Sequence, residues 1–273
     1  MNVKNLNRRD LLKASGLGAA AMAAVGSGGT ALAAERSGGN RRQREPRDVY
    51  ELRRYTMEPG AKVKIMKDFL RDAAIPAMNR IGIKQVGVFE FLEGDDPTIF
   101  VLAVHSSIWR FTSANSRLLE DEAFLKKGAS VLEAPKSDPV YAEMQSRVLL
   151  AFKNMPILVA PKKGPRIFEL RTYQSHNTVM AKRKIHMFNE GGEIAIFKET
   201  GPTPVFYGET LAGDKMPNLT YMTTSTDMEA QDAGWERFRA APKWIELKGM
   251  EMYKGTVSQS TKEFLKPTSF SQI

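Results

Sequence analysis

The chain of 273 residues contains no cysteine and only three histidines, His105, His176 and His186. The lack of cysteine excludes disulfides, so we expect the folded state to depend on burial of a core alone. It also excludes cysteine-based metal cages, and three histidines scattered along the chain argue against a zinc or haem site. We therefore predict neither a bound metal nor a cofactor.

Long apolar runs and common enzyme motifs are missing as well. Beyond the N-terminal region no stretch approaches the ~20 apolar residues that a membrane-spanning helix needs. There is no Gly-rich phosphate loop, no nucleophile elbow and no His-x-x-x-His pair. The sequence thus indicates no reaction type, and it does not choose between an enzyme and a binding protein.

Residues 1–33 have the order of a secretory signal peptide. A basic segment with paired Arg8 and Arg9 comes first, an Ala- and Gly-rich apolar run follows over 14–25, and Ala31-Leu32-Ala33 is a small-residue cleavage site. The arginine pair resembles that of the bacterial twin-arginine signal, which implies passage through that export machinery. We expect a periplasmic or secreted protein without stable membrane insertion.

Residues 34–47 are rich in arginine and nearly devoid of apolar side chains, so we predict a disordered basic linker. The signal segment and this linker each carry a net charge of about +3. They account for most of the total charge of +9, and only about +3 remains for the rest. A folded body of such low charge does not predict nucleic-acid binding, which requires a dense basic face.

A six-residue pattern, aromatic-Glu-Leu-Arg-x-Tyr, occurs twice. Residues 50–55 read Tyr-Glu-Leu-Arg-Arg-Tyr, and residues 168–173 read Phe-Glu-Leu-Arg-Thr-Tyr, so the two copies lie 118 positions apart. Other landmarks keep nearly the same spacing, because Gly82 and Gly201 are separated by 119 positions and Phe124 and Trp244 by 120. The sequence therefore predicts two copies of one structural unit.

Each copy has the order strand, helix, strand, strand, helix, strand. In the first copy we expect strands at Val49–Thr56, Ile83–Leu92, Thr98–His105 and Met144–Phe152, with helices at Ala61–Met78 and Ile108–Lys127, the latter closed by Gly128. In the second we expect strands at Ile167–Tyr173, Pro204–Thr210, Asn218–Thr224 and Ser258–Leu265, with helices at Thr178–Asn189, Ile194–Glu199 and Asp227–Ala240. Each is the order of a ferredoxin-like βαββαβ unit.

The predicted fold class is α+β, with two tandem ferredoxin-like units that form a pseudo-dimeric α/β barrel. Such a sheet carries helices on one face only, so the two open faces are expected to cover each other. We place the first domain at 48–153, a Pro-rich interdomain linker at 154–165 and the second domain at 166–273. We expect Trp109, Trp235, Trp244 and Phe238 to anchor helices on the sheets. The basic run Lys182-Arg183-Lys184 is expected to face solvent.

The repeated pattern, the segment Gly-Pro-Thr-Pro-Val-Phe-Tyr-Gly-Glu at 201–209 and the aromatic residues Trp235, Phe238 and Trp244 resemble the NIPSNAP family. This resemblance covers most of 48–273 and implies tandem domains of the dimeric α/β-barrel group. It implies little about activity, because that family has no common established reaction. Related barrels include monooxygenases that need little or no cofactor and simple ligand-binding proteins, so fold analogy does not choose a function.

Alternation along the repeated strand puts Glu, Arg and Tyr on one face. We predict that Glu51, Arg53, Tyr55, Glu169, Arg171 and Tyr173 line the space between the two sheets, on condition that the aromatic and leucine positions face the helices. Arginine and carboxylate together suit an anionic or carbonyl ligand, so Glu51, Arg53, Glu169 and Arg171 are the ligand-binding candidates. Tyr55, Tyr173 and His176 are weaker catalytic candidates, as proton donors or acid–base groups. The alternative is that each Glu–Arg pair only neutralises buried charge.

Three functional hypotheses follow. The first is a protein that binds a small organic ligand between the sheets, with a cofactor-independent monooxygenase as its enzymatic form. The second is a non-enzymatic binding or assembly protein with a purely structural barrel, in which a homo-oligomer is a possible partner. The third is a haem-handling protein, which needs His105, His176 or His186 as axial ligand.

Overall fold

The computed structural model describes residues 46–273, and the expected signal peptide (1–33) and nearly all of the expected basic linker (34–47) lie outside them. The first unit consists of β1 (Val49–Thr56), α2 (Ala61–Phe69), η1 (Leu70–Ala74), α3 (Ile75–Arg80), β2 (Val86–Phe91), β3 (Ile99–His105), α4 (Ile108–Leu119), α5 (Glu122–Leu132) and β4 (Glu143–Ala151). The second consists of β5 (Ile167–Gln174), α6 (Thr178–Asn189), α7 (Glu193–Thr200), β6 (Thr203–Ala212), β7 (Asn218–Ser225), α8 (Met228–Ala240), α9 (Pro242–Gly249), η2 (Glu251–Tyr253) and β8 (Gln259–Pro267).

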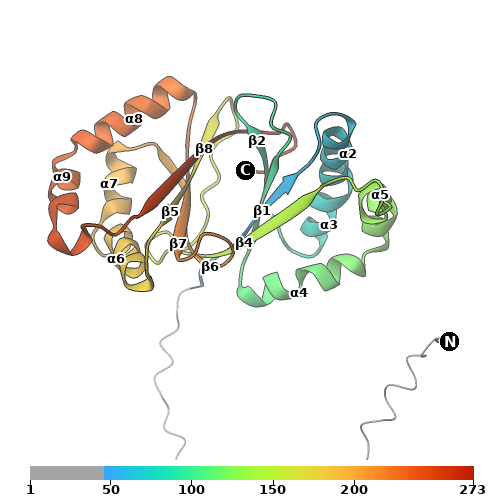
Figure 1. Ribbon diagram of the computed structural model, residues 1–273, viewed down its shortest axis with the longest axis horizontal. Helices are drawn as coiled ribbons and strands as arrows, with labels where there is room; N and C mark the ends of the chain where they lie inside the picture. The colour runs from blue at the N-terminus through green and yellow to red at the C-terminus, as the bar shows by residue number, and fades with distance from the viewer. Residues whose placement is uncertain (1–45) are drawn as a thin grey trace, which may run out of the picture. The chain divides into compact units, whose positions relative to one another are not determined.

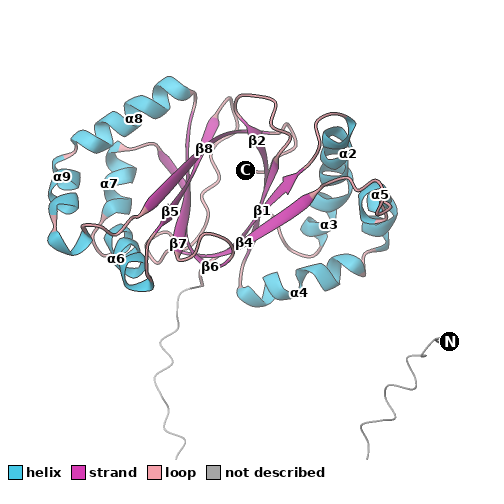
Figure 2. Cartoon of the chain, viewed as in Figure 1, coloured by secondary structure: helices cyan, strands magenta, loops and turns pink. Residues whose placement is uncertain are grey.

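The strands of the described region close into one antiparallel barrel in the order β1-β3-β2-β8-β5-β7-β6-β4. Each unit keeps its four strands together, and the units join at two seams, β2 with β8 and β4 with β6. Figure 1 shows the helices in two groups outside the strands, α2 to α5 beside the first unit and α6 to α9 beside the second. Figure 2 shows the same division by element type. The predicted α+β fold of two βαββαβ units is confirmed.

The barrel interior is an apolar core to which both units contribute. Its buried side chains include Tyr50, Leu52, Phe89, Phe100, Leu102, Leu149, Phe168, Leu170, Phe206, Met222 and Leu265. Side chains on a strand alternate between the two faces, so the neighbours Glu51, Arg53 and Tyr55 point outward, toward the helices. The prediction that these polar residues line the space between the sheets is therefore wrong. The aromatic and leucine positions occupy that space and fill it.

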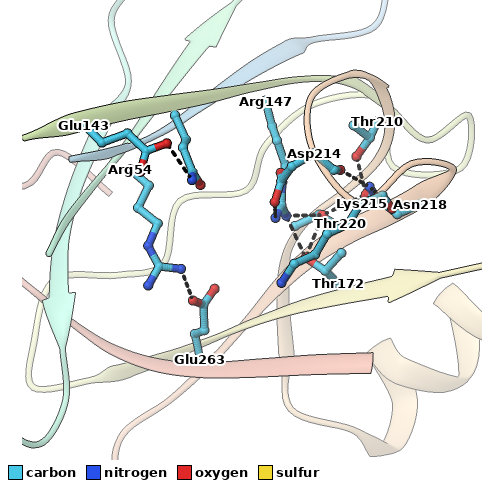
Figure 3. A network of polar contacts seen from close by, with 11 residues as sticks. Arg54, Glu143, Arg147, Thr172, Thr210, Asp214, Lys215, Asn218, Thr220 and Glu263 are labelled. Carbon is cyan, nitrogen blue, oxygen red and sulfur yellow. Dashed lines mark hydrogen bonds and ion pairs between the residues drawn. The ribbon is translucent and has the colours of Figure 1, made fainter. Parts of the chain in front are cut away.

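One end of the barrel interior is polar and links the two units through ion pairs. Arg54 Nη1 on β1 lies 2.8 Å from Glu263 Oε1 on β8. Arg147 on β4 binds Asp214 with Nε at 2.5 Å from Oδ1, and its Nη1 donates to Thr172 on β5. Figure 3 shows these side chains converging between the strands. Every charge of these two pairs is matched, so the two units are joined at this end of the barrel by a satisfied network.

The C-terminal tail, which follows β8 of the second unit, forms hydrogen bonds with β2 of the first unit. The backbone N–H of Thr268 donates to Val88 O on β2, and that of Gln272 donates to Val86 O. The last residue, Ile273, is buried in the barrel core, and Figure 1 shows the C-terminus lying within the barrel. The end of the second unit is thus part of the packing of the first.

The first long helix departs from its predicted form. The expected helix over Ala61–Met78 is divided into α2, the π-helical turn η1 and α3, which begins beside Pro76. Proline lacks the N–H that would continue the ladder of hydrogen bonds, so the backbone changes register before it. Single π turns are common next to functional sites, and Leu70 and Ala74 of this turn line the cavity described below.

The second helical segment is also divided. The expected helix over Ile108–Lys127 ends at Leu119, and a new helix starts after Asp121, whose Oδ1 accepts from Phe124 N at 2.9 Å. Gly128 lies inside α5 instead of closing the helix. A Cβ atom there would lie 2.8 Å from the ring of Phe69, so glycine permits close contact between α5 and α2.

Two of the predictions about side-chain burial are wrong in part. Trp109 is 76% exposed, so it is not a core anchor, whereas Trp235 and Phe238 are buried as predicted. Lys184 is buried against Glu193 and does not share the solvated face of Lys182.

None of the described helices has the length and apolar character needed to cross a bilayer.

Candidate functional site

A cavity of about 630 Å³ lies in the first unit, between the outer face of its sheet and helices α2, η1, α4 and α5. Most of its wall is apolar, and these residues include Met66, Phe69, Leu70, Met78, Val101, Phe111, Leu118, Phe124 and Leu132. Polar groups come from β1, from β4 and the loop before it, and from α4, namely Glu51, Arg53, Tyr55, Asn115, Tyr141 and Ser146. A mostly apolar hollow with a few convergent polar groups is the usual form of a small-molecule site.

The polar floor starts from the repeated strand pattern. Glu51, Arg53 and Tyr55 are two positions apart on β1 and therefore point to the same face. Arg53 Nε donates to Glu51 Oε1 at 2.7 Å, and Arg53 Nη1 donates to the Tyr55 hydroxyl at 3.4 Å. Tyr55 keeps its own O–H available for a ligand. Burial alone would lower the pKa of Arg53, but Tyr55 and Glu51 outweigh it and raise that pKa, so the guanidinium is permanently charged.

His105 supports this floor from below. Its Nε2 lies 3.3 Å from Glu51 Oε2, and Ser146 Oγ donates to Glu51 Oε1 at 3.4 Å. Burial raises the pKa of Glu51, but the hydrogen bond from His105 and the charge of Arg53 outweigh it and bring that pKa to about 2. Glu51 is therefore an anion that holds Arg53 in place. His105 is fully buried against Phe111, and its Nδ1 has no partner among the described residues.

The same strand pattern in the second unit has different surroundings. Arg171 Nε donates to Glu169 Oε1 at 2.5 Å, and Arg171 Nη1 lies 3.4 Å from the Tyr173 hydroxyl. Here Glu169 Oε2 accepts from Gln231 Nε2 and from Trp235 Nε1, both at 2.6 Å. The guanidinium carbon of Arg171 lies 3.8 Å from the centroid of the Trp235 ring. The indole therefore occupies the space above the ion pair.

The open space of the first unit follows from one position on α4. Ser107 caps α4 and Asp227 caps α8, so the two helices align at a shift of 120 residues. At that shift Asn115 corresponds to Trp235 and Phe111 to Gln231. Asn115 is short and lines the cavity, whereas Trp235 is buried over the Glu169–Arg171 pair. A small residue on the helix thus leaves room over Arg53.

The sequence-based candidates separate between the two units. Glu51, Arg53 and Tyr55 meet at the first cavity, and Glu169, Arg171 and Tyr173 make the corresponding cluster under α8. His176 is exposed and does not line the cavity of the first unit. His186 Nδ1 lies 2.9 Å from the Tyr253 hydroxyl.

No histidine lines this cavity or the smaller cavity of the second unit described below, so the residues present do not fit a haem with an imidazole ligand. In the described part of the chain no cluster of histidine and acidic side chains could hold a metal ion either.

Sequence reasoning missed Asn115, Ser146 and Tyr141, and it treated His105 as an ordinary strand-end residue. The repeat itself contained the signal for Asn115. Aligning the two helix caps places a small polar residue where the other copy has tryptophan. For His105 the signal is its position on β3, two residues beyond Ala103, which pairs with Glu51.

Solved structures similar to the chain include two assigned provisionally as monooxygenases. The chain from Fusobacterium nucleatum has 10% identity and a TM-score of 0.52, with 82% of this chain and 93% of that chain covered. The one from Lactobacillus acidophilus has 10% identity and a TM-score of 0.53, with 81% and 94% covered. At this identity they show a shared fold alone.

An uncharacterised NIPSNAP-like domain protein from Burkholderia xenovorans has 23% identity, with a TM-score of 0.35, and covers 39% of this chain and 88% of its own. No curated protein matches the chain. The NIPSNAP family profile matches residues 50–156 and 168–272, one match to each unit. The chain therefore belongs to the NIPSNAP family, with two NIPSNAP segments in tandem.

Proposed function

We propose that the protein binds a small organic molecule in the cavity of the first unit. The observation that carries this proposal is a cavity of about 630 Å³ whose apolar wall surrounds the ion-paired floor of Glu51, Arg53 and Tyr55. Pockets of this volume and composition hold drug-sized ligands. The site differs from the predicted one, since it lies between sheet and helices and not between the two sheets.

The polar groups restrict the chemistry of the ligand. Glu51 is saturated by Arg53, His105 and Ser146, so its carboxylate is not available to hold a second cation. Tyr55 and Arg53 offer N–H and O–H donors toward the cavity, and both recognise a carbonyl, phenolate or carboxylate oxygen. The supported ligand class is a largely apolar molecule with an oxygen acceptor at one end.

The test uses the difference between Asn115 and Trp235. The neutral apolar dye N-phenyl-1-naphthylamine is titrated into the full chain and its fluorescence is followed. We expect saturable binding that Asn115→Trp abolishes, because the indole would occupy the cavity as Trp235 does in the second unit. The control is Ser116→Trp, since Ser116 is exposed on the same helix and does not line the cavity. Equal dye binding by both variants would contradict the proposal.

A second candidate function is oxygenation of the bound molecule by O2 without a cofactor, in which one oxygen atom becomes a carbonyl oxygen at an activated CH2 carbon and the other leaves as water with the two hydrogens of that carbon. The specific observation in its favour is that two proteins of the same fold are assigned provisionally as monooxygenases. Tyr55 is the acid–base group nearest to a bound oxygen acceptor, supported by Arg53. Mass spectrometry of molecules that copurify with the protein from its native source would name the ligand. Oxygen uptake with that ligand, lost in Tyr55→Phe while binding persists, would establish the reaction, and binding without uptake would exclude it.

A further inference from the structure

The second unit has a cavity of its own, of about 320 Å³, which lies next to the indole of Trp235 and is lined by Arg171 and Tyr173 of β5 and by residues of α6, α7, α8 and α9. Its wall contains four aromatic side chains, Tyr173, Trp235, Phe238 and Trp244. The ring centroids of Phe238 and Trp244 are 4.7 Å apart with the ring planes 38° apart, and Trp235 meets Phe238 edge-on at 5.6 Å. The neighbouring faces of Phe238 and Trp244 favour a planar ligand that packs against them.

A buried lysine already occupies the position that a cation would take among these rings. Lys184 Nζ lies 5.6 Å from the ring centroid of Tyr173 and 5.6 Å from that of Trp244, and both rings line the cavity. It is paired with Glu193 at 2.8 Å, and Glu193 is almost fully buried. The favourable cation–aromatic contacts are thus made within the chain, and a second cation would be repelled.

The rim of this cavity carries positive charge that the described residues leave unpaired. Arg239 near the end of α8 and Lys248 near the end of α9 both line the cavity and are exposed. The ion pairs of residues 46–273 include neither side chain, although many other surface lysines and arginines have a partner. An anionic group at the rim would therefore meet two cations that no described carboxylate neutralises, since Glu193, the one acidic residue of the cavity wall, is paired with Lys184.

We propose that this cavity binds a small planar aromatic carboxylate. The ring packs against Phe238 and Trp244, and the carboxylate lies between Arg239 and Lys248. The proposal is independent of the ligand of the first unit, since it uses different residues on different helices. It assigns to the second unit a site with two exposed cations at its rim, where the first unit has a buried ion pair in its floor.

The test is calorimetric titration of sodium 1-naphthoate into the full chain carrying Asn115→Trp, which closes the first cavity. We expect one site per chain. Replacing both Arg239→Gln and Lys248→Gln should weaken binding about tenfold, because two charge-assisted contacts to an exposed anion are lost. Arg237→Gln is the matched control, since Arg237 is an exposed basic residue on α8 that does not line the cavity.

Two further measurements decide the charge requirement. Affinity for naphthoate should fall as salt rises from low to physiological concentration, because the anion and the cations are near the surface. The neutral analogue 1-naphthalenemethanol should bind about tenfold more weakly than naphthoate. No binding of naphthoate, equal binding by the double variant, or equal binding of the neutral analogue would each overturn the proposal. None of these outcomes depends on whether the first cavity binds a ligand.

Discussion

In both units the repeated strand places a Glu–Arg pair and a tyrosine under the helices, yet the two pairs face different surroundings. In the first unit Glu51 is held by His105 and Ser146, and the space above Arg53 is open. In the second Glu169 is held by Gln231 and Trp235, and the indole fills that space. The comparison teaches that the strand pattern builds the ion pair, while the helix above it decides how much open space remains, about 630 Å³ in the first unit and about 320 Å³ in the second.

The largest expected effect comes from removing the indole. Trp235→Ala deletes a buried ring, its hydrogen bond to Glu169 and its stacking on Arg171, and should lower the free energy of unfolding by about 4 kcal/mol. Urea unfolding of the full chain measures this loss. The matched change in the first unit, Asn115→Ala, removes an exposed side chain and should have little effect. Equal losses would show that the two helices do not differ as described.

The next effect concerns the buried Lys184–Glu193 ion pair, which joins two helices at the cavity of the second unit. Lys184→Met leaves Glu193 buried without a partner and should cost about 3 kcal/mol of unfolding free energy. Adding Glu193→Leu removes the unpaired charge, so the double variant should recover most of the loss in urea unfolding. Met66 lines the first cavity from α2 without any such pair. A double variant no more stable than Lys184→Met would contradict the account of the pair.

Acid should weaken the first unit's floor. The pKa of Glu51 is lowered from 4.5 to about 2 in the folded state, so its contribution to stability is complete above about pH 4.5 and is lost as pH falls toward 2. A shift of this size corresponds to on the order of 3 kcal/mol of unfolding free energy. Urea unfolding from pH 6 down to pH 2 should show a shallower acid loss for Glu51→Gln than for the original chain. Identical slopes would exclude this role of Glu51.

The smallest expected effect concerns the ion pairs that join the two units. Arg54→Met breaks the ion pair with Glu263, and 37% of the Arg54 side chain is exposed, so the loss of unfolding free energy should stay below about 1 kcal/mol. Arg147→Met should cost more, since Arg147 is less exposed and also donates to Thr172. Urea unfolding of the two variants, measured side by side, provides the ranking. The reverse order would mean that exposure does not decide the strength of these contacts.

The repeat, the order of elements and the barrel could be predicted from the sequence, because periodicity and spacing depend on the local chain. It also showed that Glu51, Arg53 and Tyr55 share a face. It did not show which face, since both faces of each sheet are covered in a barrel with outer helices. Tyr50 and Leu52 suit a helix-covered face as well as a barrel core, and only their contacts with the opposite sheet distinguish the two.

The cavities themselves depend on tertiary contacts that periodicity does not encode. The space over Arg53 exists because α4 carries Asn115 at one turn, and the burial of Lys184 depends on the position of Glu193 on the next helix. A charged run in a sequence is usually solvated, so Lys184 gave no local sign of its environment. Pro76 and Asp121 are visible in the sequence, but the π-helical turn before Pro76 and the start of a new helix after Asp121 are not.

The covalent link between the units gives the chain a freedom that two identical subunits lack. In a symmetric dimer every substitution appears twice, so a change that opens one pocket opens the other and a change at one seam changes both. Here β2–β8 and β4–β6 are different seams, and only the first is continued by a tail that ends at Ile273. A substitution in one unit can therefore change the cavity of that unit alone, while the other unit keeps the barrel stable.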